Sequence, residues 1–244
     1  MATLIEYSSY AITLIFVFIV IIYWIKKKIR PWTLIGFTYD KKVFPEIGFG
    51  VILCGVAVSF IFFSEWGLNF FRIQALKAPE NKFFYFLIFI FIASFIEEFI
   101  NRGLMVNGLK IILKRNWLII IVIAILFGLG HTANPNANAI SVLSSSFGGV
   151  IYTVAFLGVK NIWFPWTLHF CWNTFQFLFG FPVSGMEVPQ IVIQTDIKDS
   201  ILSGGLYGPE AGLIGIAARG VILAGILYYL RKHRAVDLKD LVCS

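Results

Sequence analysis

Long apolar stretches separated by short polar segments form the main pattern of this sequence. The apolar stretches are continuous and do not alternate every second residue, which predicts membrane-spanning helices and excludes an outer-membrane β-barrel. Because a span needs about 20 mostly apolar residues, the pattern predicts about seven transmembrane helices, within a range of six to eight. The predicted spans are approximately Leu4–Ile25, Phe44–Phe63, Phe83–Met105, Trp117–His131, Ala139–Leu157, Ile162–Phe179 and Pro209–Leu230.

Two segments between these spans have a different character. Glu65–Lys82 mixes apolar and charged residues, which predicts an interfacial helix along the outer surface of the membrane. Phe181–Tyr207 is rich in Gly, Pro and polar residues and predicts a long outer loop. A loop of that length is either functional or a simple mobile connection, and the pattern leaves both interpretations open.

The composition supports a membrane protein. Of the 244 residues, 59% are hydrophobic and 14% are charged, whereas soluble domains carry about 25% charged residues. One aqueous core cannot bury that much apolar surface, so we expect an all-α polytopic membrane protein that forms a single domain over residues 1–244. Cys54, Cys171 and Cys243 show no CxxC or metal-binding spacing, and we expect all three to be unpaired.

The net charge is +7, and the distribution of the basic residues among the loops predicts the orientation of the protein in the membrane. In a membrane protein this charge gives no indication of nucleic-acid binding. If the N-terminus lies outside, the inner loops and the C-terminal tail hold 14 Lys and Arg residues, and the outer loops hold 4. Basic residues are enriched in cytoplasmic loops. The bias therefore predicts a multi-pass protein of the cell membrane with the N-terminus outside and the C-terminus in the cytoplasm. The lipid bilayer is its expected environment, with no nucleic-acid partner.

The third predicted span contains charged residues, which are costly inside a membrane unless they are paired or face a cavity. Glu98 and Arg102 are four residues apart, share a helix face and are expected to form a structural ion pair. Glu97 shares its face with Asn101, which is neutral. Without a cation on its face, Glu97 is suited to act as a general base or acid.

Two of the three histidines also lie within predicted spans. His131 follows Phe127 by four residues, and Asn173 follows His169 by four, so each pair shares a helix face. Considered alone, an intramembrane His is more often a structural hydrogen-bonding group than a catalyst. Phe127 is most simply interpreted as a core-packing residue, and an intramembrane Asn commonly forms hydrogen bonds between helices. Together with Glu97, these groups on three spans predict one site.

Three short motifs therefore follow one another on separate predicted spans, and they are Glu97-Glu98-x-x-x-Arg102, Phe127-x-x-x-His131 and His169-x-x-x-Asn173. In this order they resemble the signatures of the CPBP intramembrane proteases, also called the Abi or CaaX protease and bacteriocin-processing family. The resemblance covers about residues 83–179. It implies an intramembrane endopeptidase of the glutamate type. Glu98, Arg102 and Phe127 would support the site, and Glu98 and Arg102 would hold the helix that carries Glu97.

The resemblance also implies the chemistry of the site. Glu97 and His131 would activate a water molecule, while His169 and Asn173 would stabilise the oxyanion of the tetrahedral intermediate. Glu97, His131 and His169 could alternatively ligate zinc. We favour the reaction without a metal or other cofactor, because the chain has no HExxH pair and Asn is a poor zinc ligand.

The predicted spans place Glu97 and His131 at different depths. At 1.5 Å per residue the difference is about 12 Å in a hydrocarbon core about 30 Å thick. The two side chains can meet if the third span lies further inward, at about Leu87–Leu109, and if the fourth extends past His131. We therefore expect shifted boundaries.

Two other functions are compatible with these residues. One is a non-proteolytic bacteriocin-immunity or membrane scaffold protein that retains the fold. The other is a proton-coupled transporter that uses Glu97, Arg102 and the histidines, although the chain lacks the inverted repeats typical of transporters. For the protease, the expected substrate is a membrane-associated peptide or protein, and the expected source is bacterial.

Overall fold

The computed structural model describes residues 35–237 continuously. Outside that range it also describes Ile19, Ile22, Tyr23, Lys26, Lys239 and Leu241. Most of the predicted span Leu4–Ile25, as well as Cys243, thus lies outside the described residues, whereas Cys54 and Cys171 are buried and free, as predicted. The described helices are α3 (Val43–Gly67), α4 (Asn81–Glu98), α5 (Asn107–Ile112), α6 (Asn116–Leu129), α7 (Ala139–Val159), α8 (Trp163–Leu178) and α9 (Leu213–His233).

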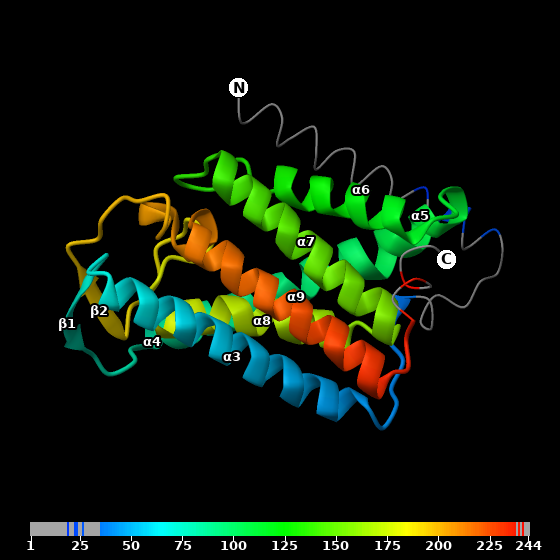
Figure 1. Cartoon of the computed structure of the whole chain (residues 1–244), viewed down its shortest axis with the longest axis horizontal. Helices are drawn as coiled ribbons and strands as arrows, with labels where there is room; N and C mark the ends of the chain where they lie inside the picture. The colour runs from blue at the N-terminus through cyan, green and yellow to red at the C-terminus, as the bar shows by residue number, and fades with distance from the viewer. Residues whose placement is uncertain are drawn as a thin grey trace.

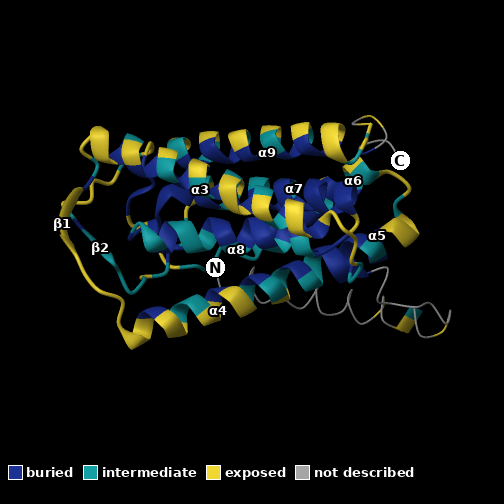
Figure 2. Ribbon diagram, turned by 90° about the horizontal axis from the view of Figure 1, so that it is seen from below, coloured by how far each residue is buried: buried dark blue, intermediate teal, exposed yellow. Residues whose placement is uncertain are grey.

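The helices form an elongated bundle in which α8 has a central place (Figure 1). Helices α3, α4 and α7 pack against α8, α9 packs against α3 and α7, and α6 packs against α7. Figure 2 shows α7 and α8 largely buried, while α3, α4 and α9 have exposed outer faces. These faces carry large apolar side chains such as Phe60 and Ile88, which is typical of a surface that meets lipid. The predicted all-α polytopic membrane fold is confirmed.

Six of the seven predicted spans correspond to helices in the described part of the chain, although their lengths differ. There, four helical segments are long and apolar enough to cross a membrane, namely 43–67, 81–112, 139–159 and 213–233. By contrast, α6 has 14 residues and α8 has 16. At 1.5 Å per residue α6 is about 21 Å long, so it ends within the bundle and is followed by the turns that contain His131.

The third span is longer than the sequence pattern predicts, because α4 continues without interruption through a π-helix, η1 (Phe99–Val106), into α5. Short π-helical segments are rare and frequently occur at functional sites. Here η1 begins directly after Glu97 and Glu98. The whole segment ends at Ile112, close to the inward boundary that the depth argument requires.

The predicted interfacial helix over Glu65–Lys82 is wrong. Helix α3 continues to Gly67, and the chain then forms the strand β1 (Arg72–Leu76). This strand pairs antiparallel with β2 (Val192–Thr195), which belongs to the predicted outer loop. The loop after α8 is therefore anchored to the segment before α4, at one end of the bundle (Figure 1).

Candidate active site

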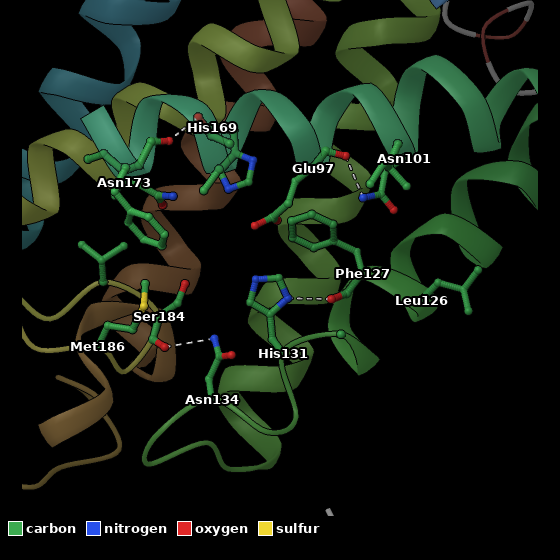
Figure 3. A pocket seen from close by; sticks show the side chains of 17 residues that line it. Glu97, Asn101, Leu126, Phe127, His131, Asn134, His169, Asn173, Ser184 and Met186 are labelled. Carbon is green, nitrogen blue, oxygen red and sulfur yellow. Dashed lines mark hydrogen bonds between the residues drawn. The ribbon is translucent and has the colours of Figure 1, made fainter. Parts of the chain in front are cut away.

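A cavity of about 310 Å³ lies between α4, the end of α6, α8 and the loop that follows α8. Four predicted catalytic residues line it: Glu97 on α4, His131 just after α6, and His169 and Asn173 on α8 (Figure 3). The predicted supporting residue Phe127 lines it as well. The structure thus brings together side chains from all three motifs, which are distant from one another in the sequence.

Glu97 and His131 face each other across the cavity (Figure 3). Helix α5 ends at Ile112 and α6 begins at Asn116, so both residues lie 15 positions from the turn that joins these helices. Because the two helices run in opposite directions from that turn, Glu97 and His131 reach similar depths. The shifted boundary of the third span resolves the depth difference of the original prediction.

The His131 ring is held by a local hydrogen bond. Its Nδ1 lies 2.7 Å from the carbonyl oxygen of Phe127, and the two rings are 4.8 Å apart at their centroids. A carbonyl oxygen can only accept a hydrogen bond, so Nδ1 is the donor. In a neutral ring, Nε2 then keeps its lone pair and can accept a proton or a hydrogen bond.

Glu97 is half-buried, and no hydrogen bond or ion pair to a described residue occupies its carboxylate. Its backbone carbonyl accepts a hydrogen bond of 2.8 Å from Nδ2 of Asn101. This contact uses the Asn101 amide to satisfy the backbone where α4 passes into η1. The Glu97 carboxylate is left available to the cavity.

Glu98 occupies a different environment from its neighbour. Its side chain is fully buried, and Oε1 accepts hydrogen bonds from Nη1 of Arg102 and from Nδ1 of His169, both at 2.9 Å. The predicted Glu98–Arg102 ion pair is therefore present. The contact with His169 was not predicted, because the two residues are 71 positions apart.

Arg102 is also fully buried, and it has neighbours besides Glu98. Its Nη2 donates a hydrogen bond of 3.1 Å to the carbonyl oxygen of Gly149 on α7. Its guanidinium carbon lies 4.9 Å from the ring centroid of Phe127 and 5.3 Å from that of Tyr152, within the range of cation–π interactions. The arginine thereby ties η1 to α6 and α7 beneath the cavity.

The position of the His169 ring is fixed on two sides. Nδ1 contacts Glu98, and the ring stacks on Tyr152 with a centroid distance of 4.8 Å and an interplanar angle of 16°. Asn173 lies one turn further along α8 and lines the same cavity. The part played by Tyr152 could not be predicted, since a tyrosine inside an apolar span carries no distinctive sequence signal.

The side chains around the cavity determine whether it could hold a metal ion. Within the described part of the chain, no group of three or more His, Cys, Asp or Glu side chains lies close enough to hold a metal ion. Glu97, His131 and His169 line one cavity without forming such a group. Nδ1 of each histidine is already bonded to the protein, so only Nε2 could meet a ligand in the cavity.

Comparison with known families identifies the segment that carries the site. Residues 79–175 match the family described as type II CAAX prenyl endopeptidase Rce1-like. No curated protein and no solved structure matches the chain. The matched segment contains all three motifs and every residue of the predicted site. Over residues 79–175 the chain is therefore similar to the CAAX protease family of membrane endopeptidases, in agreement with the resemblance of its three motifs.

Proposed function

We propose that this protein is an intramembrane endopeptidase that hydrolyses a peptide bond with a water molecule activated by Glu97 and His131. The observation that carries the proposal is the convergence of Glu97, His131, His169 and Asn173 on one cavity. A carboxylate, an imidazole acceptor and two further polar side chains supply the groups that amide hydrolysis needs. The substrate is a membrane-associated peptide or protein, because the cavity lies among membrane-spanning helices.

The reaction begins with the water molecule between Glu97 and His131. Glu97 accepts a proton from the water, His131 Nε2 orients it, and the water oxygen bonds to the carbonyl carbon of the substrate. The carbonyl oxygen becomes an oxyanion. When the intermediate collapses, the C–N bond breaks and the proton held by Glu97 passes to the leaving amine. The products are a carboxylic acid and an amine.

His169 and Asn173 are the proposed oxyanion donors. The Asn173 amide nitrogen donates without any change of charge. His169 already donates Nδ1–H to Glu98, so Nε2–H is available only when the ring is an imidazolium. Glu98 therefore positions the His169 ring, while Arg102 holds Glu98 in place.

The metal-dependent alternative would use Glu97, His131 and His169 as zinc ligands. It would require the Nε2 atoms of both histidines and the carboxylate to converge on one cation, with a neutral His169. The described side chains do not form such a group, and Asn173 is better suited to donate to an oxyanion. We therefore propose the glutamate-type reaction, with no cofactor.

The charge distribution supports one orientation of the protein in the membrane. We place the N-terminus outside and the C-terminus in the cytoplasm, because most basic residues lie in the loops that this arrangement puts inside. The source is proposed to be bacterial. A leader peptide or another membrane-anchored protein is the corresponding substrate.

Comparative membrane proteomics tests the function. Cells with the wild-type protein are compared with cells carrying Glu97→Gln, and the protein Glu187→Gln serves as a matched control, since Glu187 is exposed in the outer loop. We expect at least one membrane protein to remain uncut in the Glu97→Gln strain and to be cut in the other two. Identical proteomes would favour the non-proteolytic immunity or scaffold function, and proton-coupled uptake into vesicles would favour the transporter.

A further inference from the structure

A second buried ion pair lies beside the cavity and outside the segment that matches the family. Glu210 in the short helix η3 (Pro209–Ala211) contacts Nη2 of Arg219 on α9, and both side chains are almost completely buried. Arg219 also donates to the backbone and the hydroxyl of Ser144 on α7. A buried ion pair is costly unless its other polar atoms are also hydrogen-bonded. The further hydrogen bonds of Glu210 therefore indicate which segments the ion pair holds together.

The Glu210 carboxylate joins two walls of the cavity. Oε1 accepts a hydrogen bond of 2.8 Å from Nε1 of Trp172, the residue before Asn173 on α8. Oε2 accepts two hydrogen bonds from Ser184, one of 3.0 Å from the backbone N–H and one of 2.7 Å from the hydroxyl. One carboxylate therefore connects the helix of the proposed oxyanion donors to the loop after it.

Ser184 belongs to a tight turn over Val183–Met186 that lines the cavity. Ser184 and Gly185 both have positive φ angles, of 49° and 79°, as in a type I′ turn. This conformation is unfavourable for a serine. It is held by the two hydrogen bonds to Glu210 and by a third hydrogen bond of 3.0 Å, which Nδ2 of Asn134 donates to the Ser184 carbonyl oxygen.

Gly185 brings the turn against the loop that carries His131. A Cβ atom at Gly185 would lie 2.0 Å from the carbonyl oxygen of Pro135, so no larger residue fits there. The Gly185 N–H donates to the Tyr207 carbonyl oxygen at 3.0 Å. The turn is thus fixed between the loop after α6 and the segment before α9.

Because the polar groups of the turn are bonded to the scaffold, its contribution to the cavity is mainly apolar. Val183 and Met186 line the cavity together with Phe89 and Ile90 of α4. Figure 3 shows Met186 and Ser184 near Asn173, at the opposite end of the cavity from Leu126. An apolar wall therefore adjoins the proposed oxyanion donors.

We propose that Val183, Met186, Phe89 and Ile90 form a subsite for an apolar substrate side chain next to the cleaved bond, and that Glu210 is a positioning residue that sets the shape of this subsite. The inference rests on the proposed endopeptidase function. Met186 is the specificity-determining residue of the subsite, since it is partly exposed, flexible and carried by the turn.

Electrostatics favour the charged form of Glu210 near neutral pH. Burial raises the pKa of this carboxyl, but the Arg219 charge and the hydrogen bonds from Trp172 and Ser184 outweigh burial, and the pKa lies below its usual range. Glu210 is then a carboxylate that accepts from Arg219, Trp172 and Ser184 at once. A neutral amide could not accept all of these hydrogen bonds.

Substitution of Met186 tests the subsite. Purified wild type, Met186→Ala and Met186→Trp are incubated in detergent with an extract of membrane proteins, and mass spectrometry maps the residues that flank each cleaved bond. We expect Met186→Ala to shift the preference at one flanking position toward larger apolar residues and Met186→Trp to shift it toward smaller ones, each by about tenfold in relative kcat/KM. Leu126→Ala, at the other end of the cavity, is the control and should leave that position unchanged.

Substitution at Ser184 and Glu210 tests the positioning role. Ser184→Ala and Glu210→Gln should broaden the preference at the same flanking position and raise KM more than they lower kcat. A merely structural role would reduce the folded fraction without changing KM or preference, and thermal unfolding measures that fraction. Should Glu210→Gln fail to fold, Ser184→Ala provides the same readout with a smaller change. Glu187→Gln is the matched control in the same loop.

The outcomes separate the two proposals. If both Met186 variants cleave with the wild-type preference, the subsite is overturned while the endopeptidase stands. If Ser184→Ala leaves both KM and preference at their wild-type values, the positioning role of the Glu210 contact is overturned. A wild-type protein that cleaves nothing overturns the proposed function and the subsite with it.

Discussion

Nδ1 of His169 lies 2.9 Å from Oε1 of Glu98, on the same oxygen that accepts the Arg102 guanidinium. This contact joins the first motif to the third and gives the two adjacent glutamates different environments. Consecutive helical residues point about 100° apart. Glu98 is directed into the packed interior between helices, whereas Glu97 lines the cavity.

Glu97→Gln should abolish cleavage and leave stability nearly unchanged. The substitution removes the proposed proton acceptor, and general acid–base catalysis typically contributes about 10²–10⁴-fold to a rate. No hydrogen bond to a described residue depends on the Glu97 carboxylate, so the unfolding temperature should stay near that of wild type. Cleavage of a membrane substrate and thermal unfolding in the same detergent measure the two properties.

Glu98→Ala should lower stability as well as activity. It leaves the fully buried Arg102 without its counter-charge, and loss of one partner of a buried ion pair costs about 3–5 kcal/mol. It also removes the acceptor that holds His169. Thermal unfolding should detect the change, with a smaller loss for Glu98→Gln, which keeps an oxygen acceptor. A stable, inactive Glu98→Ala beside an active Glu97→Gln would reverse the roles of the two residues.

The faces of the site helices could be predicted from sequence, because four-residue spacing on an α-helix places side chains together. Spacing predicted the Glu98–Arg102 pair and the joint position of His169 and Asn173 on one face. The depth difference implied an inward shift of the third span and an extension of the fourth past His131. The third span does extend to Ile112, whereas the expected extension of the fourth is wrong, because α6 ends at Leu129. These inferences need only local geometry and the thickness of the membrane.

Contacts between distant segments could not be predicted in this way. The pairing of β1 with β2 joins residues about 120 positions apart, and neither strand has a strong pattern of its own. The π-helix η1 has no recognised sequence signal. A lone arginine inside a span, such as Arg219, implies a partner. The contacts of Glu210 with Trp172 and Ser184, however, depend on how α8, the turn after it and η3 pack together.

The contribution of Glu210 to stability should depend on pH. Because its pKa in the folded protein is below the usual range, the unfolded chain binds the proton first as pH falls. The stabilisation is therefore complete above the ordinary carboxyl pKa and disappears as pH falls through the folded pKa. The gap in unfolding temperature between wild type and Glu210→Gln should be largest near neutral pH and should narrow in acid. A gap that is constant or that widens in acid would contradict this assignment, and Glu187→Gln should show almost no gap at any pH.

Exhaustive chelation should leave the activity of the purified protein intact. If His169 and Asn173 both point at the substrate carbonyl, Glu97 and His131 alone remain to bind a cation, and structural or catalytic zinc sites use at least three protein ligands. The contact with Glu98 occupies Nδ1 of His169, so only Nε2 of that ring could ligate a metal, and the oxyanion role would use the same atom. Cleavage of a membrane substrate in detergent before and after treatment with a strong chelator, with elemental analysis of the same sample, measures the effect. Activity that is lost on chelation and restored by zinc alone would make His169 a metal ligand and would replace the oxyanion role proposed for it.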